Sequence, residues 1–487
     1  MPETITPVDG TARPLPPPAY RWLVLVVISL AMFGNYYVYD CISPLADVLK
    51  DQLRLSDSNI GLLQAIYSFP NIVMVLIGGL IIDRIGTKKS TLLFGTICLA
   101  GAVVTAWPDA ALTAPFGSVV RGGDAILRWL GSWFGLSWGL GIESSVLATM
   151  VAGRLVFGLG AESLIVAVTT AIARWFRGKE LSFAFGLNLT IARLGSFAAL
   201  NSPSWASSSF ANWQWPLLIS VAFGTFCVVG ALFYWVFESQ AERRYSLGAA
   251  GKTDKVNFRE VFSFGTSYWF IVALCVTFYS GIFPFQTFAV KFFIEAHGTT
   301  REIGGGLSSS LTFFAMVCTP LFGLMVDRVG KRSLFMMVGS LLLIPVYLMM
   351  AYTRMPELVL FGLPIPFTGV VFPVYLPMLM MGIAFSLIPA IMWPSVAYVV
   401  EESKLGTAYG LMTMIQNIGL FGFNLLVGWS NDRWVASAAN PAGYTPGMWI
   451  FSCLGFFGLL FAFLLRRSER GPRAHGLETI TTRSKER

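Results

Sequence analysis

Long apolar runs separated by short polar segments are the main pattern along this chain. A helix of about 20 mainly apolar residues is long enough to cross the hydrocarbon core of a bilayer. The chain contains twelve runs of about this length, at residues 20–40, 60–82, 91–107, 146–173, 183–199, 216–237, 268–293, 306–326, 334–352, 374–400, 408–429 and 448–465. The pattern predicts an all-α membrane protein with twelve transmembrane helices.

The runs fall into two groups of six. We expect a cytoplasmic tail at 1–19, an N-terminal six-helix bundle at 20–237, a cytoplasmic linker at 238–267, a C-terminal six-helix bundle at 268–465 and a basic cytoplasmic tail at 466–487. Residues 108–145 form an unusually long connection, in which Trp129, Trp133 and Trp138 predict an interfacial or re-entrant helix on the outer face.

Composition agrees with a membrane protein, since 55% of the residues are hydrophobic and 12% are charged, against about 25% charged in soluble domains. The net charge of +8 does not indicate a nucleic-acid partner, because the basic residues lie in short loops and in the tail. With both termini on the cytoplasmic side, 24 of the 34 Lys and Arg residues fall on that side and 7 on the other. This bias predicts cytoplasmic termini.

Three charges interrupt the fourth and fifth apolar runs: Arg154, Glu162 and Arg193. Glu162 and Arg193 each fall near the middle of a predicted helix, where a charge costs about 2.5–3.5 kcal/mol on insertion scales. They could pair and join the two helices, or they could bind the two ends of a zwitterionic substrate. The corresponding positions in the second half are Ser386 and Asn417, so only one half carries charge. That asymmetry favours substrate binding.

The second half would then close over the substrate with polar and aromatic groups. The candidates for these contacts are Tyr67, Tyr279, Trp393 and Asn417. Such side chains supply amphipathic ring faces and amide hydrogen bonds. For each aromatic residue, ordinary helix packing is an equally good interpretation.

A repeated G-x-x-x-D-R-x-G motif relates the two halves. Its residues are Gly79, Asp83, Arg84 and Gly86, and again, 244 positions later (327 − 83), Gly323, Asp327, Arg328 and Gly330. We expect these loops to act in gating, because glycine allows tight turns and the charges can bridge helix ends in one state and separate in another. Near the outer ends of their helices, Asp40 and Arg154 could form an outer gate pair, or could serve in capping or snorkelling.

The sequence offers no catalytic or cofactor site. The only histidines are His297, in a predicted loop, and His475, in the tail, so a metal cluster or a histidine-activated nucleophile is not expected. A G-x-x-x-x-G-K-[ST] motif for nucleotide phosphates does not occur. We expect no enzyme activity and no cofactor, and transport that is facilitated or ion-coupled.

The doubled motif, together with Arg154, Gly158 and Gly160, resembles the major facilitator superfamily. Further strings resemble the branch of that family that contains lysosomal dipeptide uniporters: Tyr67-Ser-Phe-Pro-Asn71, Gly160-Ala-Glu162-Ser163, Ala192-Arg193-Leu-Gly195 and Trp393-Pro394. The resemblance implies the major facilitator fold, with alternating access between two pseudo-symmetric bundles. It also implies a dipeptide whose amine binds Glu162 and whose carboxylate binds Arg193.

Some features depart from that branch. No acidic dileucine signal precedes Tyr20, so we expect a prokaryotic cell membrane rather than a lysosomal one, and the sequence does not indicate an accessory subunit. Lys291 is shifted by one position from the family pattern and is left outside the expected site.

Two other functions stay open: a proton-coupled transporter of organic anions or drugs, and a receptor or scaffold that does not transport. We favour uniport, because no predicted helix contains a histidine and only Glu162 and Asp40 could carry a proton.

Overall fold

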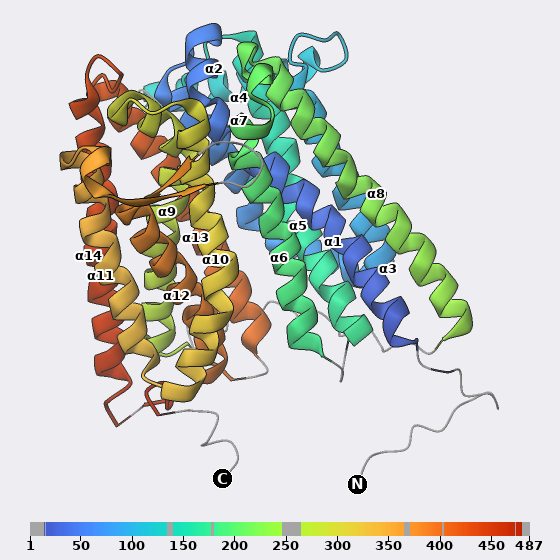
Figure 1. The fold of residues 1–487 in the computed structure, drawn as a ribbon. Coiled ribbons are helices and arrows are strands. Elements are labelled where there is room, and N and C mark those ends of the chain that lie inside the picture. The colour runs from blue at the N-terminus through green and yellow to red at the C-terminus, as the bar shows by residue number, and fades with distance from the viewer. Residues whose placement is uncertain are drawn as a thin grey trace.

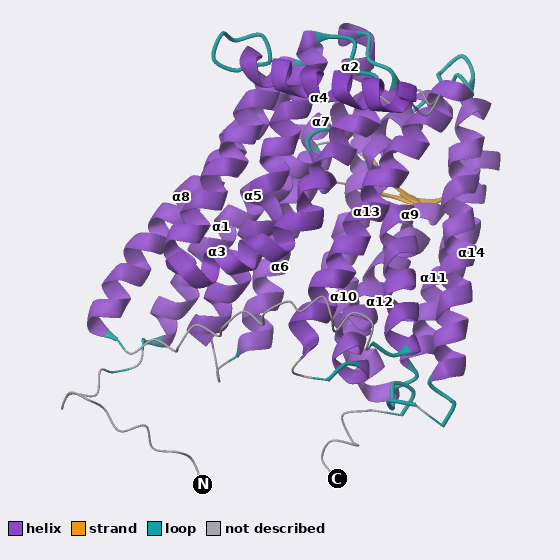
Figure 2. Cartoon of the chain, turned by 180° about the vertical axis from the view of Figure 1, so that it is seen from behind, coloured by secondary structure: helices purple, strands orange, loops and turns teal. Residues whose placement is uncertain are grey.

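The computed structural model describes residues 14, 16–133, 140–176, 180–245, 264–364, 371–401, 404–472 and 474–479, and helices make up most of them (Figures 1 and 2). Trp138, residues 1–13, most of the expected linker (246–263) and the tail beyond residue 479 lie outside the described residues.

Long helices form where the apolar runs predict them, and their outer ends differ from the predicted ones by at most seven residues. In the first half they are α1 (Pro18–Asp40), α3 (Asp57–Ala106), α5 (Ser145–Phe176), α6 (Leu181–Leu200) and α8 (Gln214–Arg244). In the second half they are α9 (Thr266–His297), α10 (Arg301–Val329), α11 (Arg332–Tyr352), α12 (Leu376–Val399), α13 (Leu405–Arg433) and α14 (Thr445–Ser468). The helices α8 and α9 extend into the expected linker from both sides.

Eleven of the described helices are long and apolar enough to cross a membrane, against twelve predicted. The difference arises in α3, a 50-residue element that contains both the second and the third predicted helix. At Gly86 the backbone is not helical, with φ 80° and ψ 164°. A left-handed φ of this kind is available to glycine at no steric cost, so the motif glycine bends the chain where the sequence predicts a loop.

Shorter elements connect the long helices: η1 (Ser43–Leu45), α2 (Ala46–Leu53), α4 (Ala114–Trp133), α7 (Ser202–Trp205), η2 (Ser207–Ala211), η4 (Met355–Leu358) and η6 (Pro441–Tyr444). The helix α4 lies where an interfacial helix is predicted. An antiparallel hairpin of β1 (Val359–Pro364) and β2 (Val371–Tyr375) was not predicted. Its second strand takes the first residues of the tenth apolar run, because Pro377 favours the first turn of a helix and α12 therefore begins at Leu376.

The two halves stand side by side (Figure 1), with α2, α4 and α7 at one end of the molecule. We call this the distal end, and we call the opposite end, where α1 begins and α14 finishes, the terminal end. The halves converge at the distal end and diverge toward the terminal end in both views (Figures 1 and 2). Hydrogen bonds between the halves join residues 43–58 to residues 286–301 and 432–436.

Glycines allow α5 to lie directly against α3. A Cβ atom at Gly158 would stand 2.4 Å from the carbonyl oxygen of Tyr67, and one at Gly160 would stand 2.7 Å from that of Phe94. Small residues at such crossings let helix backbones approach closely in membranes. This contact fixes the position of α5, and with it the position of Glu162 relative to Tyr67.

Candidate substrate site between the two halves

Glu162 lies on α5, one turn beyond Gly158, and faces α3. The hydroxyl group of Tyr67 donates a hydrogen bond of 3.2 Å to its carboxylate. The ring of Tyr67 is itself packed between Tyr39, with ring centroids 4.7 Å apart, and Phe157, 5.4 Å apart. Glu162 is partly exposed, so its carboxylate is oriented by Tyr67 and still accessible to a further partner.

Arg193 lies on α6, and its guanidinium carbon is 4.8 Å from the centroid of the Phe385 ring on α12. It is partly exposed and, within the described part of the chain, makes neither a hydrogen bond nor an ion pair. Gly195 brings α6 against α1, since a Cβ atom there would meet the carbonyl oxygen of Phe33 at 2.2 Å. The guanidinium therefore lies over a ring of the other half, and its N–H donors have no acceptor among the described residues.

Glu162 and Arg193 do not pair with each other, since the ion pairs among the described residues do not join them. Tyr36 on α1 interacts electrostatically with both, so the three side chains border one region. A pair that joined α5 to α6 would have its carboxylate and guanidinium in contact. The separation instead leaves one acid and one base available to a molecule that carries both charges.

Aromatic residues of the second half face this region. The indole of Trp393 donates a hydrogen bond of 2.9 Å to the hydroxyl of Tyr279, and Tyr409 donates one of 3.0 Å to the carbonyl of Trp393. The rings of Tyr279 and Phe283 are stacked, with centroids 5.6 Å apart. Phe283 also lies 6.3 Å from Tyr39 of the first half. The aromatic wall therefore reaches from α12 and α13 through α9 to α1.

Asn417 is buried on α13, and its side chain is turned toward its own helix. Its amide nitrogen donates to the carbonyl of Thr413 at 3.0 Å. The amide oxygen of Asn417 is buried without a hydrogen-bond partner among the described residues. That oxygen is therefore available for a further contact.

Arg154 does not form the expected gate pair with Asp40, since the ion pairs of the described residues do not include one between them. Its guanidinium donates instead to the carbonyls of Val38, Tyr39 and Leu63 and to the side chain of Gln64, at 2.7–3.2 Å. Two of those carbonyls belong to the last turn of α1, where helix carbonyls lack intrahelical donors. Arg154 thus caps α1, and Asp40 lies nearer to Ser196 on α6.

The residues of the repeated motif lie at the terminal end, remote from Glu162 and Arg193. They are Gly79, Asp83, Arg84 and Gly86 on α3 and Gly323, Asp327, Arg328 and Gly330 on and after α10. Asp83 is 16 positions along α3 from Tyr67, which corresponds to about 24 Å of helix. Asp327 forms an ion pair of 2.7 Å with Arg332. The motif belongs to turns at the helix ends and does not contribute to the substrate region.

Several residues of this region were not among the predicted site residues: Tyr36, Tyr39, Phe283, Phe385 and Tyr409. A signal existed for Tyr36 and Tyr39, which lie just before Asp40 in a polar stretch of an apolar helix. Phe385 offers no comparable signal, because it is one of 40 phenylalanines in the chain.

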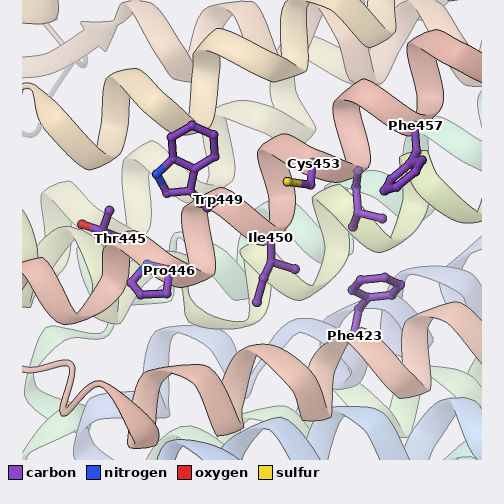
Figure 3. Close-up of a pocket in the computed structure, with 8 residues that line it drawn as sticks. Phe423, Thr445, Pro446, Trp449, Ile450, Cys453 and Phe457 are labelled. Carbon is purple, nitrogen blue, oxygen red and sulfur yellow. The ribbon is translucent and has the colours of Figure 1, made fainter.

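A groove of about 510 Å³ opens elsewhere, between α13 and α14. Figure 3 shows its lining, in which Trp449, Ile450, Cys453 and Phe457 follow one face of α14 and Phe423 projects from α13. Its lining side chains carry no charge, and their polar groups are the hydroxyl of Thr445, the indole N–H of Trp449 and the thiol of Cys453. A charged or zwitterionic substrate would find no counter-charge there.

Spanning helices in two halves, with an acid and a base between them, define a membrane transporter rather than an enzyme. The chain belongs to the Major Facilitator Superfamily, whose family model matches residues 28–423.

Among curated proteins, the chain is similar to the lysosomal dipeptide transporter MFSD1. The zebrafish (Danio rerio) protein is 30% identical over 84% of this chain and 80% of its own length. The human (Homo sapiens) protein is 29% identical over the same shares of the two chains.

Two solved structures share the fold. One is a bacterial homologue of the human lysosomal transporter Spinster in an inward-facing, occupied conformation, with a TM-score of 0.63 and 15% identity over 93% of this chain and 98% of that one. The other is the D-xylose–proton symporter, with a TM-score of 0.64 and 16% identity over 91% and 97%. At these identities the likeness extends to the fold alone.

Proposed function

We propose that this transporter carries dipeptides or similar zwitterions, with Glu162 binding the amine and Arg193 the carboxylate. The observation that carries the proposal is that the two charges lie in adjacent spanning helices, are partly exposed and are not paired with each other. Leaving two such charges unpaired within a membrane is costly unless a ligand satisfies them. The similarity to dipeptide transporters supports the same substrate class.

The chemistry of the site suits the two ends of a short peptide. Two extended residues span at most about 7 Å, so the termini of a dipeptide can reach two separate helices. A guanidinium with free N–H donors binds a carboxylate in a bidentate manner. The rings of Tyr279, Phe283 and Trp393 would then cover the side chains of the peptide.

The mechanism that we infer is alternating access, with the halves at residues 20–237 and 268–465 rocking about the site. The excess of Lys and Arg in the loops of the terminal end supports a cytoplasmic position for that end. In this orientation the closed distal end faces outward, and the two halves diverge toward the cytoplasm (Figures 1 and 2). We propose the prokaryotic cell membrane as its location.

Uptake by proteoliposomes tests the proposal. We expect labelled dipeptide to enter vesicles that contain the protein, unlabelled dipeptide to compete, and Arg193→Ala to abolish entry. Arg121→Ala, at an exposed position on α4, is the matched control and should transport normally. Entry at the normal rate in Arg193→Ala would exclude Arg193 from the site.

A second candidate is a proton-coupled transporter of organic anions. It is favoured by the free N–H donors of Arg193, which would bind a carboxylate without any amine. More distant relatives include a probable sulfoacetate transporter of Cupriavidus necator, 21% identical over 64% of this chain, and a hexuronate transporter of Escherichia coli, 24% identical over 45% of it. Uptake that needs a pH gradient and ignores the amino group of the substrate would favour this alternative.

A further inference from the structure

A cluster of charged side chains lies at the distal end, outside the substrate region. It consists of Lys50, Asp57, Lys291, Glu295 and Asp432, and we call it the distal lock. The ammonium group of Lys291 donates to both carboxylate oxygens of Asp57, at 2.5 and 2.6 Å, and both side chains are completely buried. Asp57 belongs to the first half and Lys291 to the second, so the pair spans the boundary between the halves.

Asp432, in the last turn of α13, binds the beginning of α3. Its carboxylate accepts hydrogen bonds from the backbone amides of Asp57, at 2.8 Å, and Ser58, at 2.7 Å. The first amides of a helix have no intrahelical acceptor, and the N-terminus of a helix favours negative charge. A side chain of the second half therefore caps a helix of the first half.

The remaining charges complete the cluster. Lys50 donates to the carbonyl of Ala436 in the second half at 3.3 Å and lies 3.4 Å from Asp57. Glu295 lies 3.7 Å from Lys291 and accepts a hydrogen bond from Tyr444. Each buried charge thus has an opposite charge or a helix terminus beside it.

We propose that the distal lock holds the distal end closed and that it opens when water replaces these contacts between the halves. The contacts can exist only while α3 lies against α9 and α13. A buried, well-bonded ion pair gains about as much from its partner as it loses in hydration, whereas one partner left alone is strongly unfavourable. The lock therefore makes closure dependent on correct pairing without making the closed state too stable to open.

Graded effects follow from this arrangement. Asp57→Asn leaves Lys50 and Lys291 without their shared carboxylate and should favour the open distal end most strongly. Lys291→Met should have a smaller effect, because Asp57 retains Lys50. The double variant Asp57→Asn/Lys291→Met removes both charges and should close again, as apolar replacements of buried pairs commonly do.

The chain provides its own control. Asp47 and Arg301 also pair between the halves, at 2.5 Å, but their side chains are 10% and 24% exposed. Water reaches the guanidinium of Arg301, so this pair is partly screened, and neither partner is completely buried as Asp57 and Lys291 are. Asp47→Asn/Arg301→Met should therefore change the closure of the distal end much less than Asp57→Asn.

Cysteine accessibility tests the proposal without substrate, so its outcome does not depend on which molecule is transported. Ser43, which donates to the carbonyl of Gln286 across the boundary, is 4% exposed and becomes the reporter as Ser43→Cys in a cysteine-free background. We expect a membrane-impermeant maleimide to label it at least tenfold faster in Asp57→Asn, and within threefold of the parent rate in the double variant. Unchanged labelling in Asp57→Asn, or a double variant as reactive as Asp57→Asn, would overturn the proposal.

A distance measurement distinguishes opening from unfolding. Spin labels at the exposed positions Lys89 and Val329, at the terminal ends of the two halves, should approach each other in Asp57→Asn, because alternating access closes one end as the other opens. An unfolded variant would instead give a broad distribution of distances. Faster labelling together with a broad distribution would contradict the lock.

Discussion

Arg154 and Arg193 are arginines within adjacent spanning helices, and their surroundings differ completely. Arg154 is 1% exposed and has four acceptors, three of them backbone carbonyls. The guanidinium of Arg193 lies over the ring of Phe385 and has no hydrogen-bond acceptor among the described residues. The sequence identifies both as charges in apolar helices, but it cannot separate them, because backbone carbonyls become available only where helices end and meet. One arginine is structural, and we assign the other to the substrate.

Arg193→Lys should reduce dipeptide transport, and Arg193→Ala should abolish it. A charge-assisted hydrogen bond contributes about 1.5–3 kcal/mol, roughly a 10- to 100-fold change in affinity. Lysine keeps the charge but loses the bidentate geometry. Initial uptake rates in proteoliposomes measure the series, and a lysine variant that transports like the parent would show that charge alone suffices.

Arg154→Lys should lower stability rather than affinity. It leaves one or more of the four acceptors unpaired, at about 1–3 kcal/mol for each buried group. We expect a lower thermal unfolding temperature in detergent with unchanged dipeptide affinity in the folded fraction. Weaker binding at unchanged stability would indicate a direct role in the site.

Acetylation of the amino group of the dipeptide should weaken binding, because the neutral amide cannot pair with Glu162. Competition between free and acetylated dipeptide for uptake measures the difference. Glu162→Gln should remove most of the preference for the free amine. Equal competition by the two peptides in the parent protein would exclude Glu162 as the amine ligand.

At the level of elements, the apolar runs predict the ends of the long helices to within seven residues, except that α3 joins two of the predicted helices. They do not predict the hairpin of β1 and β2, whose strands are as apolar as the helices beside them. The geometry of the site depends on helix crossings at which a glycine allows close contact, such as Gly158 against Tyr67. The apolar runs alone do not show which glycine faces a neighbouring helix. The charged candidates Glu162 and Arg193 were therefore predictable, but the ring of Phe385 beside Arg193 and the grouping of the site were not.

Gly158→Ala should impair both stability and transport. Its new methyl group would stand 2.4 Å from the carbonyl oxygen of Tyr67, so α5 and α3 must separate and the contact between Tyr67 and Glu162 is disturbed. Gly186→Ala on α6 is the matched control, since nothing lies within 4 Å of the added atom. The thermal unfolding temperature and the uptake rate should both fall for Gly158→Ala and stay unchanged for Gly186→Ala.

The segment after α14 folds back onto the terminal end of the second half. Glu469 accepts hydrogen bonds from the Ser267 hydroxyl, at 2.6 Å, and the backbone amide of His475, at 2.8 Å. Leu477 is completely buried, and its carbonyl accepts from the amide of Arg332 at 3.4 Å. Burial alone would raise the pKa of the Glu469 carboxyl, but the hydrogen bonds from Ser267 and His475 outweigh it and lower that pKa.

A lowered carboxyl pKa stabilises the docked segment above the usual glutamate pKa of about 4.3, and this stabilisation is lost as pH falls through the lowered value. Hydrogen exchange at the amide of Arg332 should therefore accelerate on acidification, relative to the intrinsic rate. Glu469→Gln should remove most of this dependence. Equal protection at neutral and acidic pH would contradict it.

At the scale of the whole molecule, the repeated motif and the charge bias predict two halves of like orientation. They do not predict which end is closed, because one sequence must support both states of the cycle. The contacts at the closed end join residues that are far apart in sequence. One of them links the backbone amide of Asp57 to the carboxylate of Asp432, 375 positions away. The sequence around Lys291 does not predict a role for this residue. Its position at the boundary between the halves does.

The most direct test of the account is the final distribution of labelled dipeptide across proteoliposomes that are given a pH gradient, with the dipeptide supplied only from outside. The account predicts that dipeptide enters faster than in protein-free vesicles, that entry requires Arg193, and that the internal concentration stops at the external one. Failure of dipeptide to enter would contradict the proposed substrate. Accumulation above the external concentration would contradict uniport and would make Glu162 the first carboxyl to examine as a proton carrier.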